Sequence, residues 1–301
     1  MKRLLLTPLL LIACGPSASD TALLRPDGGG CLPGYGCTDG SLVIDAGPIT
    51  IPNEPLEDWG DAGAGGLLTG IFAVEATVTV RSGIEVTSKQ LYRLRIAQDG
   101  TTVHQKTTLC AMSLPSIPNV VTLTIPQKLQ SLIASTSSES TGEYLSSASV
   151  LQAKYSPPAL LEVFGAKLAN PATDPLPTME AGATTDDDND GNPGVTLYAQ
   201  TVTCTAPQEL YVALRVSGQL GGTVQTPDVI TGFAQVHLDE SVLGYSDPCL
   251  SVATNIGLVV EPDSPFRAQR VGPAEDVDQN GNVSCPEIVI NAASIFPDWA
   301  Q

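Results

Sequence analysis

The chain has 301 residues, of which 32 are Asp or Glu and 14 are Lys or Arg, so its formal net charge at pH 7 is −18. A surface this acidic repels nucleic acid and anionic lipid headgroups and attracts cations, so the sequence argues against nucleic-acid binding. Only two histidines are present, which limits hydrolytic mechanisms that use imidazole as a base or a metal ligand.

Residues 1–14 predict an export signal. Lys2 and Arg3 form a charged start, and residues 4–12 form an apolar run that is shorter than the roughly 20 residues needed to span a bilayer. The run ends in Leu-Ile-Ala-Cys at positions 11–14, which resembles the lipobox of bacterial lipoproteins. The resemblance implies that Cys14 is acylated and anchors the chain in the cell envelope. Gly15 after the cysteine favours the outer membrane, facing the periplasm or the cell surface.

Residues 15–66 predict a flexible tether between the anchor and the folded domain. The stretch is rich in Gly, Pro, Asp and Ala and cannot bury enough apolar area to offset the entropy of ordering it. Without Lys2 and Arg3, the mature chain carries 12 Lys and Arg against 32 Asp and Glu, a formal balance of −20.

Residues 67–301 predict one β-rich domain. Apolar residues recur at every second position from Phe72 to Val80, which is typical of a half-buried antiparallel strand. Further strands are expected at 92–96, 101–109, 121–125, 195–203, 210–216, 223–230, 234–238 and 256–260, and short helices at 127–134, 158–164 and 286–296. The pair Asp99-Gly100 predicts a tight hairpin, and residues 135–149 read as a loop. The predicted fold class is mostly β: a single antiparallel β-sandwich or barrel of about eight or nine strands.

Six cysteines remain once Cys14 is assigned to lipid. An even number in an exported chain indicates disulfides rather than metal thiolates, although six cysteines allow 15 connectivities. Our interpretation pairs them in chain order: Cys31 with Cys37, Cys110 with Cys204, and Cys249 with Cys285.

The strongest site signal is the segment 276–287, which resembles the calcium loop of an EF-hand. The pattern has oxygen-bearing side chains at loop positions 1, 3, 5 and 9, glycine at 6 and glutamate at 12, because calcium takes six to eight oxygen ligands around a sharp turn. The expected ligands are Asp276, Asp278, Asn280, Asn282, Ser284 and Glu287. Gly272-Pro273 before the loop prevents an entering helix, so the segment is closer to the dockerin-type loops of secreted bacterial proteins. Ser284 and Glu287 also form a helix-capping box, which is compatible with calcium binding.

A second acidic segment, 186–194, repeats the Asp-x-Asp-x-Asp-Gly opening. Its expected metal ligands are Asp186, Asp188, Asp190 and Asn192. It lacks the acid at position 12, where Leu197 stands, so a ligand from elsewhere is required. The alternative is a solvated acidic turn.

The whole layout, from lipobox through acidic tether to a β-domain with these loops, resembles uncharacterised lipoproteins of the myxobacterial kind. That resemblance implies a lineage and no activity. The sequence lacks a Gly-x-Ser-x-Gly elbow, a His-Glu-x-x-His helix and a phosphate-binding glycine loop. The leading hypothesis is therefore a non-enzymatic binding or envelope-structural module with calcium as its cofactor. Its partners would be the lipid bilayer through Cys14 and a protein or glycan ligand. The alternatives are a calcium-dependent polysaccharide hydrolase or lyase, favoured by a carboxylate pair in a cleft, and a carbohydrate-binding or adhesive domain.

Overall fold

The computed structural model describes residues 66–81, 85–114, 117, 120–255, 259–261 and 263–297. The export signal, Cys14, the tether up to residue 65 and the expected Cys31–Cys37 pair lie outside the described residues. No helix in the described ranges combines the length and apolar character needed to cross a membrane.

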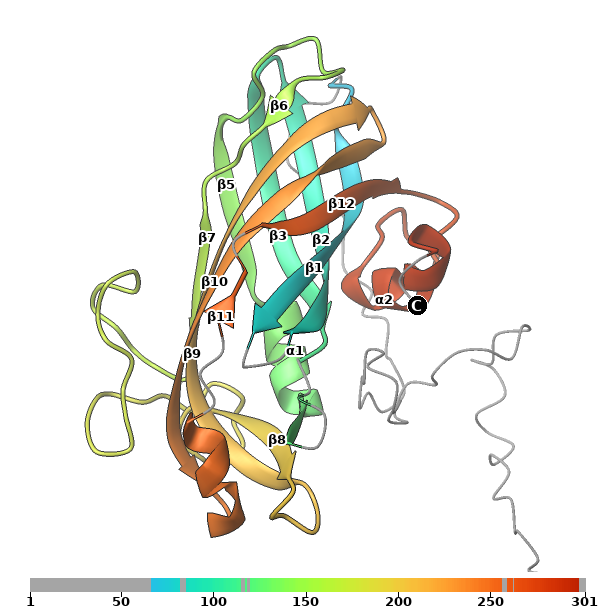
Figure 1. Cartoon of the computed structure of the whole chain (residues 1–301). Helices are drawn as coiled ribbons and strands as arrows, with labels where there is room; N and C mark the ends of the chain where they lie inside the picture. The colour runs from blue at the N-terminus through green and yellow to red at the C-terminus, as the bar shows by residue number, and fades with distance from the viewer. Residues whose placement is uncertain are drawn as a thin grey trace, which may run out of the picture.

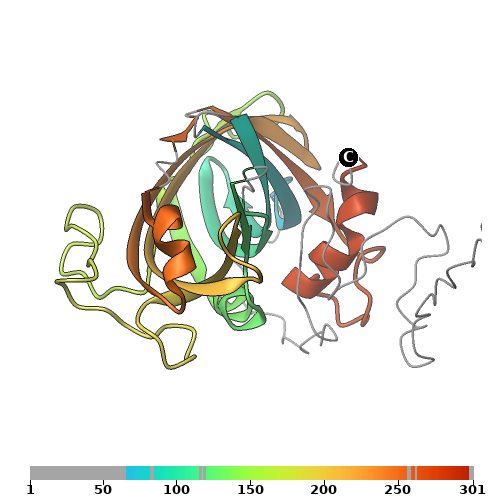
Figure 2. The same ribbon diagram turned by 60° about the horizontal axis from the view of Figure 1, so that its bottom comes forward.

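The described chain forms one curled sheet of twelve strands (Figure 1). The main path runs β4 (Val121–Thr124), β8 (Val195–Thr201), β9 (Gln208–Thr226), β10 (Val229–Tyr245), β12 (Ser264–Val271), β1 (Gly70–Arg81), β2 (Glu85–Asp99), β3 (Thr102–Met112), β5 (Ser137–Glu143). Of the short strands, β6 (Lys154–Tyr155) and β7 (Leu160–Phe164) pair with β9, and β11 (Val259–Val260) pairs with β1. Every pairing is antiparallel. Seen from below, the sheet curls round on itself (Figure 2). The predicted mostly β, antiparallel class is confirmed.

The alternation read from the sequence places the core on the concave face. On β1, Phe72, Val74 and Ala76 are almost fully buried and alternate with residues of the convex face. They belong to an upper core, which lies at the β6 end of the sheet and also contains Leu145 and Tyr155. A lower core fills the other end, where the helix α1 (Gln127–Ser135) packs Leu129 and Ile133 among residues of β8 and β9.

A third apolar cluster, the outer core, lies on the convex face. There the helix α2 (Cys285–Ile295) packs against β2 and β3, with Ile288 and Ala292 covering Leu91 and Ala111. Both faces of β1, β2 and β3 are therefore covered by protein, which explains why these strands carry apolar residues on both sides.

Two sequence predictions about secondary structure are wrong, while α1 and α2 confirm the predicted helices at 127–134 and 286–296. Residues 158–164 contain the strand β7, because Leu160, Glu162 and Phe164 follow period two along the edge of β9. Residues 135–149 contain the strand β5, whose Ser and Thr side chains pair along β3. The expected strands 210–216 and 223–230 merge into β9, which ends at Thr226 before a turn into β10.

The described disulfides are Cys110–Cys285 and Cys204–Cys249, with Cα–Cα separations of 4.9 and 5.3 Å. The expected pairings Cys110–Cys204 and Cys249–Cys285 are therefore wrong. The reason is spatial: Cys110 lies on the convex face of β3 beneath α2, whereas Cys204 follows β8 beside the 3-10 helix η2 (Pro248–Asn255).

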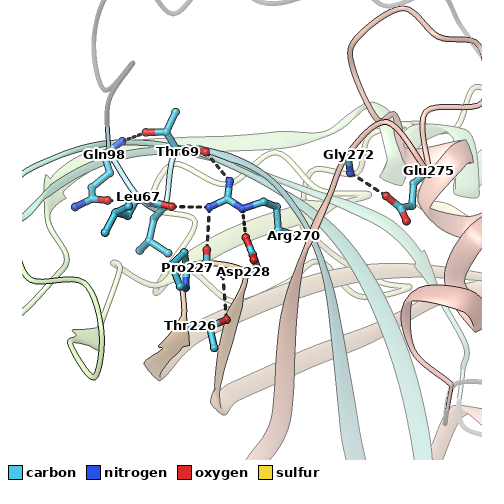
Figure 3. A network of polar contacts seen from close by, with 10 residues as sticks. Leu67, Thr69, Gln98, Thr226, Pro227, Asp228, Arg270, Gly272 and Glu275 are labelled. Carbon is cyan, nitrogen blue, oxygen red and sulfur yellow. Dashed lines mark hydrogen bonds and ion pairs between the residues drawn. The ribbon is translucent and has the colours of Figure 1, made fainter.

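The side chain of Arg270 holds the beginning of the described domain against the β9–β10 turn (Figure 3). Its guanidinium donates hydrogen bonds to the carbonyl oxygens of Thr69, Leu67 and Pro227 at 2.5, 2.7 and 2.8 Å. It also pairs with the carboxylate of Asp228 at 2.7 Å and stacks on Phe72. One planar group thus joins three separate segments, which a point charge could not do.

Candidate metal centre

The loop 276–287 lies between β12 and α2 and is fastened to the convex face of the sheet. The disulfide Cys110–Cys285 ties its C-terminal part to β3. The buried guanidinium of Arg93 on β2 donates to the carbonyl of Val283 at 2.7 Å and to the side-chain oxygen of Asn282 at 2.5 Å. The loop is therefore held from two strands, which limits how far a bound ion could deform it.

Within this loop, carboxylates converge on one point. One oxygen each from Asp276, Asp278 and Glu287 lies within 4.8 Å of the others, so the three could hold a metal ion. Asp276 accepts hydrogen bonds from the amides of Asn280 and Gly281 at 3.2 and 2.8 Å. Gly281 has φ +83°, a left-handed conformation that glycine adopts without strain, as the sharp turn at position 6 requires.

Glu287 closes the loop from the first turn of α2. Its Oε1 accepts the amide of Val277 at 2.6 Å, and its Oε2 accepts the amide and hydroxyl of Ser284 at 2.7 and 2.8 Å. Ser284 and Glu287 are fully buried. The capping arrangement and the convergence of the carboxylates thus coexist, as expected from the sequence.

The loop 186–194 has the same backbone plan. Asp186 accepts the amides of Asp190 and Gly191, each at 3.0 Å, in the way that Asp276 accepts those of Asn280 and Gly281. Position 7 donates to the side chain of position 5 in both loops, at 2.8 Å for Asn192 and 2.7 Å for Asn282. Positions 4 and 6 have positive φ in both, at Asn189, Gly191, Gln279 and Gly281.

Three carboxylates also converge in this second loop. One oxygen each from Asp186, Asp188 and Asp190 lies within 4.8 Å of the others. Asp188 is only 6 % exposed, and its Oδ1 is buried without a hydrogen-bond partner, while Oδ2 accepts the amide of Thr196 at 2.9 Å. A buried carboxylate oxygen without a donor is costly, and a cation between the three aspartates would supply the missing partner. The donor set therefore fits a metal ion.

The electrostatics of the second loop agree with this geometry. Burial raises the pKa of Asp188, and the neighbouring carboxylates of Asp190 and Asp186 add to the rise. At Asp190 burial acts in the same direction, but hydrogen bonds from Thr196 and Asn192 outweigh it and lower the pKa. A cation beside Asp188 would favour its ionised form and so oppose this rise.

Thr196 is a site residue that sequence reasoning missed. Its amide binds Asp188 and its hydroxyl binds Asp190, so one residue orients two of the three carboxylates. Leu197, at loop position 12, is buried in the lower core and supplies no ligand. A hydroxyl residue at position 11, at the start of a strand, is the signal that could have identified Thr196.

The carboxylate of Asp187, inside the second loop, contacts a residue outside the loop. Its carboxylate accepts the amide of Gly165 at 2.6 Å, and Lys128 of α1 donates to the carbonyl of Asn189 at 2.9 Å. These contacts fasten the loop to its surroundings and leave the other three aspartates to face one another.

The two loops gather oxygen ligands only, which hard divalent cations prefer. No protein-family model, curated protein or solved structure matches the chain in the comparisons. The geometry of these loops and of the sheet that carries them is therefore the basis for inferring a function.

Proposed function

We propose that the chain is a lipid-anchored protein of the bacterial cell envelope whose β-domain is a non-enzymatic binding module stabilised by calcium. The single observation that supports calcium most is the shared plan of the two loops, each of which brings three carboxylates within 4.8 Å. The two disulfides among the described residues agree with an oxidising compartment outside the cytoplasm. The lipobox supports an anchor at Cys14, with the outer membrane as its location.

Calcium would act as a structural staple in this proposal. In the first loop it would neutralise Asp276, Asp278 and Glu287 and join β12 to the start of α2. In the second it would satisfy the buried Oδ1 of Asp188 and hold the loop to the start of β8. The chemistry it supplies is charge neutralisation, and the chain's own residues orient the ligands.

The hydrolase alternative is less well supported. Glu162 of β7 and Glu240 of β10 both lie on the concave face, and burial raises the pKa of both. Hydrolysis by two carboxyl groups needs one to be protonated while the other is ionised, so their environments should push the two pKa values apart. Burial alone accounts for both shifts and neither carboxyl group contributes to the other's, so nothing in this pair assigns one group as the acid and the other as the base.

The test is thermal unfolding of the full chain in excess calcium and in chelator. Saturation about 100-fold above Kd stabilises the fold by about 2.7 kcal/mol per site, so the midpoint should rise clearly with calcium. Asp276→Ala and Asp188→Ala should each remove part of the rise, and bound calcium measured after dialysis should fall from two ions per chain to one in either variant. Glu180→Ala, which removes an exposed acid outside both loops, is the matched control. A midpoint that ignores calcium would contradict the metal proposal.

The anchor has a separate test. Metabolic labelling with a fatty-acid analogue should mark the natural chain and leave Cys14→Ser unlabelled. Equal labelling of the two chains would rule out Cys14 as the acylated residue.

A further inference from the structure

The concave face of the sheet is unevenly filled between the upper and lower cores. The inward residues of β9 are fully buried at its two ends, at Val224 and Val212, and only half-buried between them, at Leu214, Val216 and Leu220. Leu214 borders the lower core and Leu220 the upper core, while Val216 belongs to neither. The middle of the concave face therefore has accessible space, which we call the inner hollow.

The inner hollow opens at the side, between β5 and β7. Above the opening, the sheet is closed by the bridge between Leu145 and Tyr155, and below it lies the end of α1. No ladder among the described residues joins β5 to β7. A cleft of about 470 Å³ occupies this place, and its lining includes Ser138, Glu162 and Phe164. Clefts of this volume are typical of small-molecule sites.

Two carboxyl groups project from the concave face into the region between the cores. Glu162 alternates with Leu160 and Phe164 on β7, and Phe164 is buried in the lower core, so Glu162 faces the same side. Glu240 lies opposite Leu214 in the β9–β10 ladder and is exposed, although its concave-face neighbours on β10 are half-buried. Exposure of a side chain on the concave face is expected only where the sheet encloses accessible space.

Neither carboxyl group has a hydrogen bond or an ion pair with another described residue. The curled sheet surrounds both carboxyl groups, although the side chain of Glu240 keeps access to solvent. Their charged form is therefore poorly solvated, and this burial raises the pKa of both. The hydroxyl of Tyr92, on β2, also has a raised pKa, first through burial and then through the charge of Glu162. The groups that face the hollow are thus acidic or neutral, and none of those named is basic.

We propose that the inner hollow binds a small amphipathic cation, with its apolar part against the Leu and Val side chains of the concave face and its ammonium group at Glu162, which lines the cleft. Glu240, on the concave face of β10, adds negative charge to the same face. This inference rests on the proposed role as a binding module and specifies its ligand class. A cation supplies the counter-charge that Glu162 lacks, whereas a neutral ligand leaves this carboxylate unpaired and an anion is repelled by it. The acidic surface of the chain also raises the local concentration of cations near the opening.

The test compares three probes of one shape: hexylammonium, hexanol and hexanoate. Each is titrated calorimetrically into the calcium-saturated full chain carrying Cys14→Ser, so that no acyl chain competes for the hollow. Hexylammonium should bind at least tenfold more tightly than hexanol, and hexanoate should show no binding. The double variant Glu162→Gln/Glu240→Gln should bind hexylammonium and hexanol equally.

Two further variants locate the effect. Glu139→Gln removes a carboxylate that also lines the cleft but pairs with His104 at 2.6 Å on the outside, so it should keep the preference for the cation. Ser138→Phe should fill the opening and abolish binding of both hexylammonium and hexanol. Circular dichroism confirms that each variant is folded before titration.

Equal affinity for hexylammonium and hexanol in the unmodified chain would overturn the proposal, as would a preference that survives in the double variant. Absence of any binding would overturn it as well. The calcium-dependent rise in the unfolding midpoint is recorded on the same samples. A normal rise without probe binding refutes the ligand proposal alone, whereas absence of both refutes the metal proposal too.

Discussion

Removing the disulfide Cys110–Cys285 should destabilise the domain more than removing Cys204–Cys249. The first closes a loop of 175 residues and the second a loop of 45 residues. In the chain-entropy description, a crosslink stabilises by restricting the unfolded chain, which amounts to about 5 kcal/mol for the longer loop and about 4 kcal/mol for the shorter one. The longer crosslink also fastens the first metal loop, so its removal should weaken calcium stabilisation as well.

The assay is guanidinium chloride unfolding followed by far-UV circular dichroism, in calcium and in chelator. Cys110→Ala/Cys285→Ala is compared with Cys204→Ala/Cys249→Ala, which serves as its matched control because it also removes one disulfide next to an apolar core. We expect the larger loss of unfolding free energy, and a smaller calcium increment, only in the first double variant. The reasoning is refuted if the second double variant loses more stability, or if the calcium increments of the two variants are equal.

Three more predictions concern single side chains. Arg270→Lys should lower the free energy of unfolding by about 2 kcal/mol, measured by urea titration, because an ammonium group cannot reach the same four acceptors. Arg267→Lys is the control: it lies on the exposed side of β12 and should change the free energy of unfolding little. Gly165→Ala should lower the free energy of unfolding by at least about 2 kcal/mol and Gly100→Ala by about 1 kcal/mol. Both glycines have positive φ, but only at Gly165 would an added Cβ meet backbone atoms at 2.7 Å. Equal losses in the two variants would contradict this prediction. Burial raises the pKa of Glu162, so the folded state binds its proton more tightly, and this contribution is present at low pH and lost as pH rises through the raised pKa. The free energy of unfolding of Glu162→Gln should therefore equal that of the parent at acidic pH and exceed it at neutral pH. If the two free energies depend on pH in parallel, the prediction is wrong.

Period-two alternation was enough to predict the strands whose two faces differ. β1 has buried side chains at every second position, and its alternation is visible in the sequence. β5 escaped prediction because its inward residues are small and polar, with Ser138 and Ser140 half-buried opposite β3. β7 was taken for a helix because Pro157-Pro158 before it and Gly165 after it fit the first and last residues of a helix. The adjacent leucines at 160 and 161 also conceal the alternation, although Leu161 is exposed on the convex side. Both errors fall on the strands that flank the opening of the hollow.

The two acidic loops that could hold a metal ion could be predicted because their carboxylates are close in sequence and depend on a local turn. Asp276, Asp278 and Glu287 converge as expected, and so do the three aspartates of the second loop. Disulfide pairing was not predictable in the same way, because it depends on which strand α2 covers. Thr196 was missed although it is close in sequence to the aspartates of the second loop. Its contact with Asp188 depends on how β8 begins, which the sequence pattern does not show.

The two carboxyl groups of the hollow interrupt the local sequence pattern of their strands. Leu160-x-Glu162-x-Phe164 and Leu238-x-Glu240-x-Val242 each place one acid where the alternation calls for an apolar residue. In a filled core, such an acid would need a buried partner, and neither carboxyl has one among the described residues. Departures from a local pattern without internal compensation are expected at functional sites. The break in the pattern on two strands that pair with the same strand, β9, therefore supports the ligand proposed for the hollow.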